Sequence, residues 1–247
     1  MKKAVLIKYI DSIAPFEHCV AQDNVGELIK GKDEIMRVMV CLDISKQAVD
    51  FAVASKVDMI ITHHPVIYDP LYRILDDVLI SVIQNKIGII SAHTNYDADR
   101  LNDVLAKYCG IADTAKIFYE DGIFLGRIGN VEETTFLEYM NYLKAKMNLE
   151  KVKITGISPD KVRRVAVGTG SSNSFSSLIP SLDADVFVCG ELKYDLVKSI
   201  AEKGPVIVEL GHYESEECFI DDLSELLKKD LPQIEVLQYK KRISTYI

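Results

Sequence analysis

Short apolar runs alternate along the chain with longer segments in which apolar residues recur every three or four positions. The short runs predict buried strands, and the longer segments predict amphipathic helices. The predicted strands cover residues 38–42, 59–62, 88–91, 123–131, 164–167, 186–189, 206–210 and 234–239. The predicted helices cover residues 45–55, 71–85, 100–108, 134–147, 175–181, 194–203 and 215–229. Such alternation predicts an α/β protein with mixed sheets flanked by helices.

An internal repeat divides the chain into two similar halves. Segment 37–45 (RVMVCLDIS) resembles segment 164–172 (RVAVGTGSS), and the same offset aligns VDMIITHHP with ADVFVCGEL. The third strand of each half ends in a histidine followed four positions later by an acid, namely His93 with Asp97 and His212 with Glu216. We therefore predict two α/β lobes that arose by duplication, residues 1–120 and 121–247, with no inserted third domain.

The charge balance argues against nucleic-acid binding by the chain as a whole. The 247 residues contain 29 Lys and Arg against 37 Asp and Glu, which gives a formal net charge of −8. An acidic chain suits divalent cations better than phosphates. Segment 144–164 is a local exception, because it holds seven basic residues and only two acids. The cluster keeps nucleic acid open as a partner, although an exposed helix face followed by a turn is the simpler explanation.

Cysteine usage and hydropathy restrict the class of protein further. The five cysteines are widely spaced without a C-x-x-C pair, which argues against a disulfide framework and against a cysteine zinc site. No run of 18 apolar residues occurs, and Lys8 and Asp11 interrupt the apolar stretch near the start. We therefore expect no membrane span, no signal peptide and a cytoplasmic location.

Histidines gather where predicted strands end. The chain has five, and four of them (His63, His64, His93 and His212) directly follow buried strands. Ligand sites in open α/β sheets lie at the carboxyl ends of strands. Adjacent side chains in a regular strand point to opposite faces, but Pro65 ends the strand, so His63 and His64 can serve one site. A hydrogen-bonded structural role is the alternative for each histidine taken alone.

Asp97 and Glu216 add carboxylates to the same strand ends. His63, His64, Asp97, His212 and Glu216 together make five candidate ligands, too many for one tetrahedral structural zinc. They fit a dinuclear site with open positions for water, which is a catalytic arrangement. Zinc, iron, manganese and nickel all accept such donors, so two divalent ions of unknown identity are predicted. Helix capping is the alternative for each acid.

Four segments resemble the Nif-three-like family, whose members are often labelled type-two GTP cyclohydrolase I homologues. They are THHPVIYDP, AHTNYD, CGELKYD and GHYESE. The early AQDNVGELIKG also resembles the family's D-N-x-G-L-x-x-G stretch, with Glu27 in place of leucine. The resemblance spans residues 10 to 240. It implies two similar lobes facing a dinuclear metal site between them, a ligand set at the five positions named above, and a toroidal homohexamer.

Two further groups of residues are candidates for catalysis and for substrate binding. His93 is the repeat counterpart of His212, and Glu191 aligns by the repeat with His64, so we expect these two to move protons or to orient a metal-bound water. Gly168, Gly170 and Ser171 lie in a GTG-SS segment after a predicted strand. Backbone amides there could hold a phosphate, although a plain tight turn is the simpler explanation.

The leading hypothesis is a metal-dependent hydrolase that acts on a nucleotide or another small phosphorylated substrate. The GTP cyclohydrolase label comes from the resemblance alone, since the sequence has no separate guanine-reading signature. One alternative is a non-enzymatic metal-binding or regulatory protein with the same ligands. The other is a toroidal nucleic-acid-binding protein that uses the basic cluster 144–164.

Overall fold

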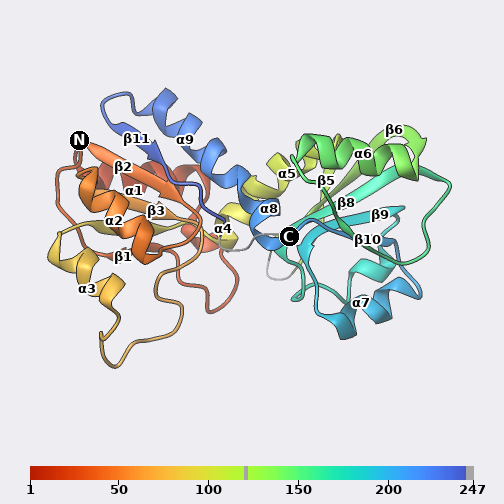
Figure 1. The fold of residues 1–247 in the computed structure, drawn as a ribbon, viewed down its shortest axis with the longest axis horizontal. Coiled ribbons are helices and arrows are strands. Elements are labelled where there is room, and N and C mark those ends of the chain that lie inside the picture. The colour runs from red at the N-terminus through yellow and green to blue at the C-terminus, as the bar shows by residue number, and fades with distance from the viewer. Residues whose placement is uncertain (120–121, 243–247) are drawn as a thin grey trace. The chain divides into compact units, whose positions relative to one another are not determined.

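The computed structural model describes residues 1–119 and 122–242, which form two compact units (Figure 1). Unit 1 joins Met1–Asp99 to the segment that begins at Phe219, and unit 2 is the continuous segment Arg100–Cys218. This division differs from the sequence-based boundary at residue 120, because the end of the chain returns to the sheet of the first unit. None of the helices in the described ranges is long and apolar enough to cross a membrane.

Unit 1 is built on a five-stranded mixed sheet. The strand order is β1 (Gly26–Ile29), β4 (Gly88–Ser91), β3 (Met59–Thr62), β2 (Arg37–Cys41) and β11 (Glu235–Gln238). All neighbouring pairs are parallel except β1 with β4. In Figure 1 the blue β11 lies beside the orange β2, so strands from the two ends of the chain are neighbours. The carboxyl ends of β2, β3 and β4 therefore meet at one edge.

The main helices of unit 1 are α1 (Lys3–Ile13), α2 (Lys46–Ala54), α3 (Asp77–Gln84) and α9 (Cys218–Asp230). Ser45 caps α2 as predicted, because its hydroxyl accepts from the backbone N–H of Ala48. α3 begins later than the expected residue 71, because the Asp76 carboxylate caps it. Short segments complete the unit: η1 (Phe16–His18), α4 (Thr94–Tyr96) and the π-helical η2 (Asp97–Leu101), which runs into unit 2.

Unit 2 is built on a six-stranded mixed sheet. The order is β5 (Ala112–Lys116), β6 (Arg127–Thr135), β8 (Lys161–Ser171), β9 (Val186–Glu191), β10 (Val206–Glu209) and β7 (Lys153–Thr155). The central strands β8, β9 and β10 are parallel, while β6 and β7 run antiparallel to their neighbours. The central strands are buried along most of their length, and the edge strand β5 is exposed throughout.

The helices of unit 2 are α5 (Asn102–Tyr108), α6 (Phe136–Lys146), α7 (Tyr194–Ala201) and α8 (His212–Glu216). Thr135 and Glu138 form a reciprocal capping box at the start of α6, which explains where the predicted helix begins. The helix predicted over 175–181 is only a short 3-10 turn, η3 (Ile179–Ser181). α5 and α6 pack through Leu105 and Leu143 into the core formed with β8 and β9.

The two sheets share an order of strands. In unit 1, β2, β3 and β4 are parallel neighbours followed by the antiparallel β1, and in unit 2, β8, β9 and β10 are parallel neighbours followed by the antiparallel β7. The fold is the predicted mixed α/β architecture with helix-flanked sheets. The shared order is what the internal repeat predicts for the two halves, and descent from a duplicated ancestor remains our proposal for its origin.

Candidate metal centre

His63 and His64 lie directly beyond the end of β3. The strand stops at Thr62, as Pro65 leads one to expect. The backbone N–H groups of the two histidines donate to the carbonyl oxygens of Cys41 and Leu42, at 3.2 and 3.1 Å. Their ring centroids are 5.1 Å apart. Both imidazoles are therefore held side by side at the carboxyl edge of the sheet, and that of His63 is fully buried.

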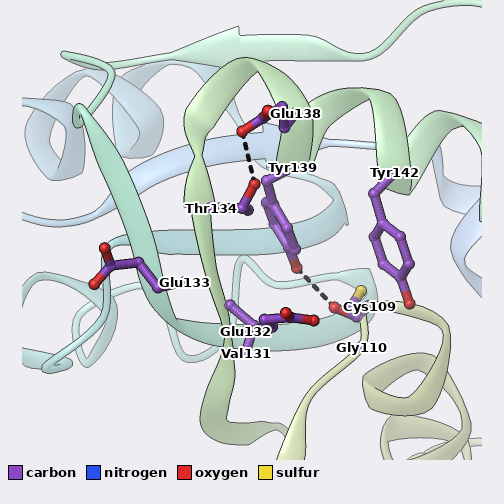
Figure 2. Close-up of a pocket in the computed structure, with 9 residues that line it drawn as sticks. All are labelled: Cys109, Gly110, Val131, Glu132, Glu133, Thr134, Glu138, Tyr139 and Tyr142. Atoms are coloured by element: carbon purple, nitrogen blue, oxygen red, sulfur yellow. Dashed lines mark hydrogen bonds between the residues drawn. The ribbon is translucent and has the colours of Figure 1, made fainter.

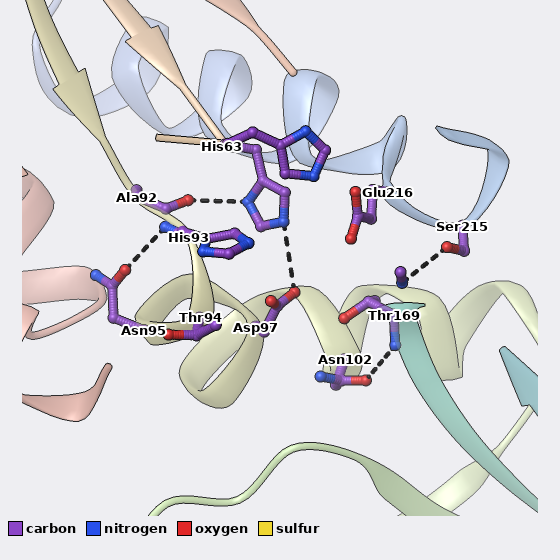
Figure 3. Close-up of polar contacts among 12 residues, drawn as sticks. His63, Ala92, His93, Thr94, Asn95, Asp97, Asn102, Thr169, Ser215 and Glu216 are labelled. Atoms are coloured by element: carbon purple, nitrogen blue, oxygen red, sulfur yellow. Dashed lines mark hydrogen bonds and ion pairs between the residues drawn. The ribbon is translucent and has the colours of Figure 1, made fainter. Parts of the chain in front are cut away.

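His93 and Asp97 come from the segment that follows the neighbouring strand β4. His93 precedes α4, and Asp97 begins the π-helical η2, a local geometry that is frequent at functional sites. The backbone N–H of Asp97 donates to the His93 carbonyl at 3.0 Å. Asp97 Oδ1 lies 3.7 Å from His63 Nε2, as Figure 3 shows. The segment after β4 thus places a third imidazole and a carboxylate beside the carboxyl end of β3.

His63, His64 and His93 form a group that could hold a cation. One ring nitrogen of each lies within 4.8 Å of a nitrogen of the others. The His63 and His93 centroids are 5.2 Å apart, and those of His64 and His93 are 5.6 Å apart. Three neutral imidazoles are a donor set that zinc, iron and nickel accept. The sequence placed His93 outside the ligand set, whereas the structure places it beside both predicted ligands.

Each of these imidazoles has its Nδ1 atom in a hydrogen bond that points away from the group. His63 Nδ1 lies 2.9 Å from the Ala92 carbonyl oxygen. His64 Nδ1 lies 2.8 Å from Asp43 Oδ1, and His93 Nδ1 lies 2.9 Å from Asp23 Oδ1. Because carbonyl and carboxylate oxygens only accept, Nδ1 donates in all three pairs, and Nε2 is the atom with a lone pair for a cation.

Asp23 has an enclosed environment behind His93. Its carboxylate accepts from the His93 ring, from the Thr94 backbone N–H and hydroxyl, and from the Asn24 backbone N–H. Burial by itself would raise the pKa of Asp23, but the hydrogen bond and charge of His93 together with the Thr94 donors outweigh it. The pKa therefore lies below its usual range, and the side chain is a carboxylate at neutral pH.

Unit 2 presents a second donor pair, His212 and Glu216, on α8. Gly211 precedes the helix with φ 107°, a conformation that suits glycine and turns the chain directly from β10 into α8. His212 Nε2 lies 3.2 Å from Glu216 Oε2, and His212 Nδ1 lies 3.1 Å from Glu191 Oε1. Glu216 is buried, while Glu191 is exposed at the end of β9. His212 and Glu216, the two ligands predicted for this half of the chain, thus lie in contact within unit 2.

Gly170 packs directly against this pair. A Cβ atom at residue 170 would lie 1.9 Å from Glu216 Oε1 and 3.1 Å from His212 Nε2, and φ is +53°. Its backbone N–H donates to Ser215 Oγ at 2.9 Å. A side chain would fill the space that the two donors need, so glycine is required here.

The residues predicted to hold a phosphate lie within the last part of β8 rather than in a separate turn. The backbone N–H of Thr169 donates to Asn102 Oδ1, and that of Gly170 is engaged by Ser215. Gly168 is a buried partner of Cys189 in the ladder, and the Ser171 hydroxyl accepts from Asn173. Phosphate binding by Gly168, Gly170 and Ser171 stays a prediction, and these contacts already use several of its proposed donors.

The basic cluster 144–164 is largely paired with nearby acids. Lys161 and Arg163 both contact Glu133, and Lys153 contacts Glu209 Oε2 at 2.6 Å. Arg164 lies 3.8 Å from Asp183. These pairs lower the net positive charge that the cluster presents, so its structure does not favour a phosphate-binding surface.

A cavity of about 410 Å³ lies in unit 2 between β6 and α6 (Figure 2). Tyr139 and Tyr142 stack along it with ring centroids 6.1 Å apart, and the Tyr139 hydroxyl donates to the Cys109 carbonyl at 2.9 Å. Two of its carboxylates already have partners: Glu138 completes the capping box of α6, and Glu133 binds the cluster bases. The cavity therefore offers no set of donors comparable to the strand-end groups.

Sequence reasoning missed two carboxylates. Asp23 lies in the stretch AQDNVGELIKG, which contributed to the sequence-based prediction only through the family resemblance, and Asp43 follows the first predicted strand. Both contact an imidazole through its Nδ1 atom. The signal that could have revealed Asp43 is the one that revealed the histidines, namely a polar residue directly beyond the carboxyl end of a buried strand.

A family profile described as Duf34/NIF3 (NGG1p interacting factor 3) matches residues 1–243. The chain belongs to this family. A Clostridium perfringens relative named "GTP cyclohydrolase 1 type 2 homolog" is 30% identical over 245 residues, covering 94% of this chain and 93% of the relative. A relative of the same name from Methanocaldococcus jannaschii is 29% identical and covers 94% and 96%.

Solved structures of other proteins share the fold over nearly the whole chain. Reduced HcgD from Methanocaldococcus jannaschii is 27% identical, has a TM-score of 0.86 and covers 98% of both chains. A hypothetical protein from Staphylococcus aureus is 25% identical, has a TM-score of 0.89 and covers 100% of this chain and 99% of its own. The resemblance predicted from the strand-end motifs is thus confirmed at the level of the family.

Proposed function

We propose that this NIF3-family chain is a metal-dependent hydrolase with a dinuclear divalent-metal centre. The proposed ligands are His63, His64 and Asp97 of unit 1 with His212 and Glu216 of unit 2. The observation that carries the proposal is the convergence of imidazoles with a carboxylate at the ends of β3 and β4. The paired His212 and Glu216, with the glycine that makes room for them, support it from the second unit.

The donor chemistry fits borderline divalent ions. Imidazole nitrogens and carboxylate oxygens suit zinc, iron, nickel and manganese, and five protein ligands for two ions leave positions for water. A pair of such ions lowers the pKa of bound water and polarises a scissile bond. Within the protein, the Ala92 carbonyl orients the His63 ring, and the turn at Gly211 sets the start of α8.

We propose that His93 receives or returns the proton during hydrolysis. Its ring lies beside those of His63 and His64, and Asp23 holds its Nδ1 atom, so its Nε2 atom has the lone pair. Glu191 contacts the far side of His212, which is a position for orienting that ring. The substrate class that we propose is a nucleotide or another small phosphorylated compound, in keeping with the name GTP cyclohydrolase 1 type 2 homolog that the relatives carry.

The test is turnover by the metal-loaded protein. We expect consumption of GTP or of another nucleotide, followed by chromatography, to require added zinc, iron or manganese. His63→Ala should abolish it, and His93→Ala should slow it about 100-fold while metal content stays the same, because general acid–base groups contribute roughly that much. Asp69→Ala, at an exposed loop position, is the matched control. Stoichiometric metal binding without turnover of any nucleotide would contradict the hydrolase and favour a metal-binding or regulatory protein.

We also propose that the chain assembles as the toroidal homohexamer that the family resemblance implies, in the cytoplasm. Light scattering of the purified protein should then give six times the chain mass of 27.7 kDa. A monomer or dimer at micromolar concentration would contradict the hexamer without affecting the metal centre.

A further inference from the structure

We propose that Asp23, Asp43 and Glu191 are positioning residues that fix the protonation pattern of the imidazoles in the candidate centre. Each carboxylate would hold its histidine as the Nδ1–H tautomer. The Nε2 lone pair of His64 and His212 would then be directed toward the cation, and that of His93 would be available to accept a proton. The inference rests on the proposed metal centre and deepens it, because it assigns three residues outside the ligand set to that centre.

The geometry repeats at three histidines from different segments. Asp23 pairs with His93 at 2.9 Å, Asp43 pairs with His64 at 2.8 Å, and Glu191 pairs with His212 at 3.1 Å. In every pair the contact is made by Nδ1. A neutral imidazole has one donor and one acceptor nitrogen, and the hydrogen bond at one nitrogen decides the role of the other. The carboxylates at Nδ1 of His64 and His93 therefore leave Nε2 as the acceptor. His212 also has Glu216 Oε2 3.2 Å from its Nε2 atom, so Glu191 competes there with a second carboxylate for the ring proton.

His63 provides an internal comparison. Its Nδ1 atom donates to the Ala92 carbonyl, which Figure 3 shows, so the same tautomer is set by the backbone. A backbone carbonyl cannot be removed by substitution, whereas the three carboxylates can. The protein thus uses one kind of hydrogen bond at all four strand-end histidines, with acceptors of different origin.

Burial ranks the three pairs. The Asp23 side chain is fully buried, whereas those of Asp43 and Glu191 are 42% and 55% exposed. Water competes for the hydrogen bond of an exposed pair, and a buried carboxylate keeps its orientation. We therefore expect Asp23 to have the largest effect on its histidine and Glu191 the smallest.

The surroundings of Asp23 make an isosteric substitution informative. Its described hydrogen-bond partners are all donors: the His93 ring, the Thr94 N–H and hydroxyl, and the Asn24 N–H. His93 Nδ1 lies 2.9 Å from Oδ1 and 3.0 Å from Oδ2, so in Asp23→Asn one of its two acceptor oxygens becomes an NH2 group. An NH2 group can donate to Nδ1 only when the imidazole carries its proton on Nε2. The variant should therefore increase the share of the Nε2–H tautomer of His93 while keeping the size of the side chain.

The first experiment reads the tautomers directly. Long-range proton–nitrogen NMR correlations of the full-length, metal-free protein, recorded at a pH where the histidines are neutral, distinguish Nδ1–H from Nε2–H. We expect Nδ1–H at His64 and His93 in the wild type. Asp23→Asn should increase the Nε2–H share at His93 and leave the His18 signals unchanged, since His18 contacts Asp99 instead.

The second experiment measures zinc affinity by competition with a chromophoric chelator. Removal of a carboxylate behind a metal-binding histidine typically costs 10–100-fold in affinity. We expect Asp43→Asn near the upper end of that range and Glu191→Gln lower, because the Asp43 carboxylate is the less exposed of the two. Asp23→Asn should leave zinc affinity unchanged, because its partner His93 is outside the proposed ligand set. Asp69→Asn, at an exposed loop position, should have no effect. In a His64→Ala background, Asp43→Asn should cause no further loss, because it acts through His64.

The outcomes separate this inference from the proposed function. A wild-type protein that binds no zinc contradicts the metal centre. An Nε2–H signal for His93 in the wild type, or an unchanged tautomer in Asp23→Asn, contradicts the positioning role whatever the zinc result. A loss of zinc affinity in Asp43→Asn that persists in full in the His64→Ala background also contradicts it, since Asp43 would then act by another route.

Discussion

Gly170 shows how little room surrounds the donors of unit 2. A side chain at residue 170 would overlap with Glu216 Oε1 and crowd His212 Nε2. We expect Gly170→Ala to lower stability by about 2 kcal/mol or more, because it combines an unfavourable positive φ with a steric conflict. Zinc affinity should fall as well, because Glu216 must move. Thermal unfolding and chelator competition measure the two effects.

Gly122 is the matched control for this substitution. It also has a positive φ, +83°, but a Cβ atom there would meet nothing within 4 Å. Gly122→Ala should therefore cost only the backbone contribution, about 1 kcal/mol, with zinc affinity unchanged. Equal losses in the two variants would show that crowding at Gly170 is not important.

Asp23 should give stability a specific dependence on pH. Its pKa is lower in the folded protein than in the unfolded chain, where an aspartate titrates near pH 4. The stabilisation that its carboxylate supplies is then complete above about pH 4 and is lost as the pH falls through the folded-state pKa. We expect the stability difference between wild type and Asp23→Asn, from urea unfolding, to shrink below pH 4. A difference that grows on acidification would contradict this assignment.

Thiol reactivity tests the burial of the cysteines. Burial raises the pKa of Cys109 to about 12, and it raises those of Cys41 and Cys189 strongly. Cys19 is only partly buried, although burial and the nearby Asp23 raise its pKa as well. At pH 8 we expect a chromogenic thiol reagent to label Cys19 slowly in the native protein and the buried cysteines only after denaturation, since the reagent must reach the sulfur and the thiolate is the reactive form. Rapid labelling of several thiols in the native protein would contradict the packing.

At the scale of elements, the buried Arg127 ties β6 to α5. Its guanidinium is fully buried and makes two contacts with the Asp103 carboxylate, at 2.6 and 2.9 Å. Asp103→Ala should destabilise the protein by about 3 kcal/mol, because it leaves a buried charge without its counter-ion. The double variant Arg127→Met with Asp103→Ala should lose less. Urea unfolding measures the free energy of unfolding of both variants. A double variant that is less stable than Asp103→Ala would show that the ion pair is unimportant.

The sequence predicts elements well where burial is complete and poorly where it is not. β3, β4 and β9 are buried runs, and their patterns reveal them. β5 is exposed at every position and pairs only with β6, so it has no apolar pattern to detect. His63 and His64 could be predicted as site residues because they directly follow a buried strand that Pro65 ends. Asp23 could not, because that carboxylate lies in a loop and is recruited by tertiary contacts.

At the scale of the whole molecule, the chain leaves unit 1 after Asp99 and returns to it at Phe219. Periodicity predicts the last strand but not its partner, since β11 pairs with β2 across most of the sequence. Pairings of such long range depend on tertiary packing that no local pattern encodes. The sequence-based boundary at residue 120 assigned this returning segment to the second lobe for that reason.

The division into units predicts how fragments behave. Unit 2 is continuous and has its own core around Leu143, Val165 and Val188. A fragment of residues 100–218 should therefore unfold cooperatively in urea. A fragment of residues 1–99 lacks α9 and β11 and should remain unfolded until a peptide of residues 219–247 is added. Circular dichroism measures both, and a folded 1–99 fragment would contradict the role of the returning segment.

The central claim is that the chain holds two divalent ions through its strand-end histidines and carboxylates. Elemental analysis of untagged protein, after reconstitution with zinc, iron or manganese, tests it most directly. We predict about two ions per chain in the wild type and in the Asp69→Ala control, and fewer in both His63→Ala and Glu216→Ala. No metal above background in the wild type, or an unchanged content in both ligand variants, would contradict the claim.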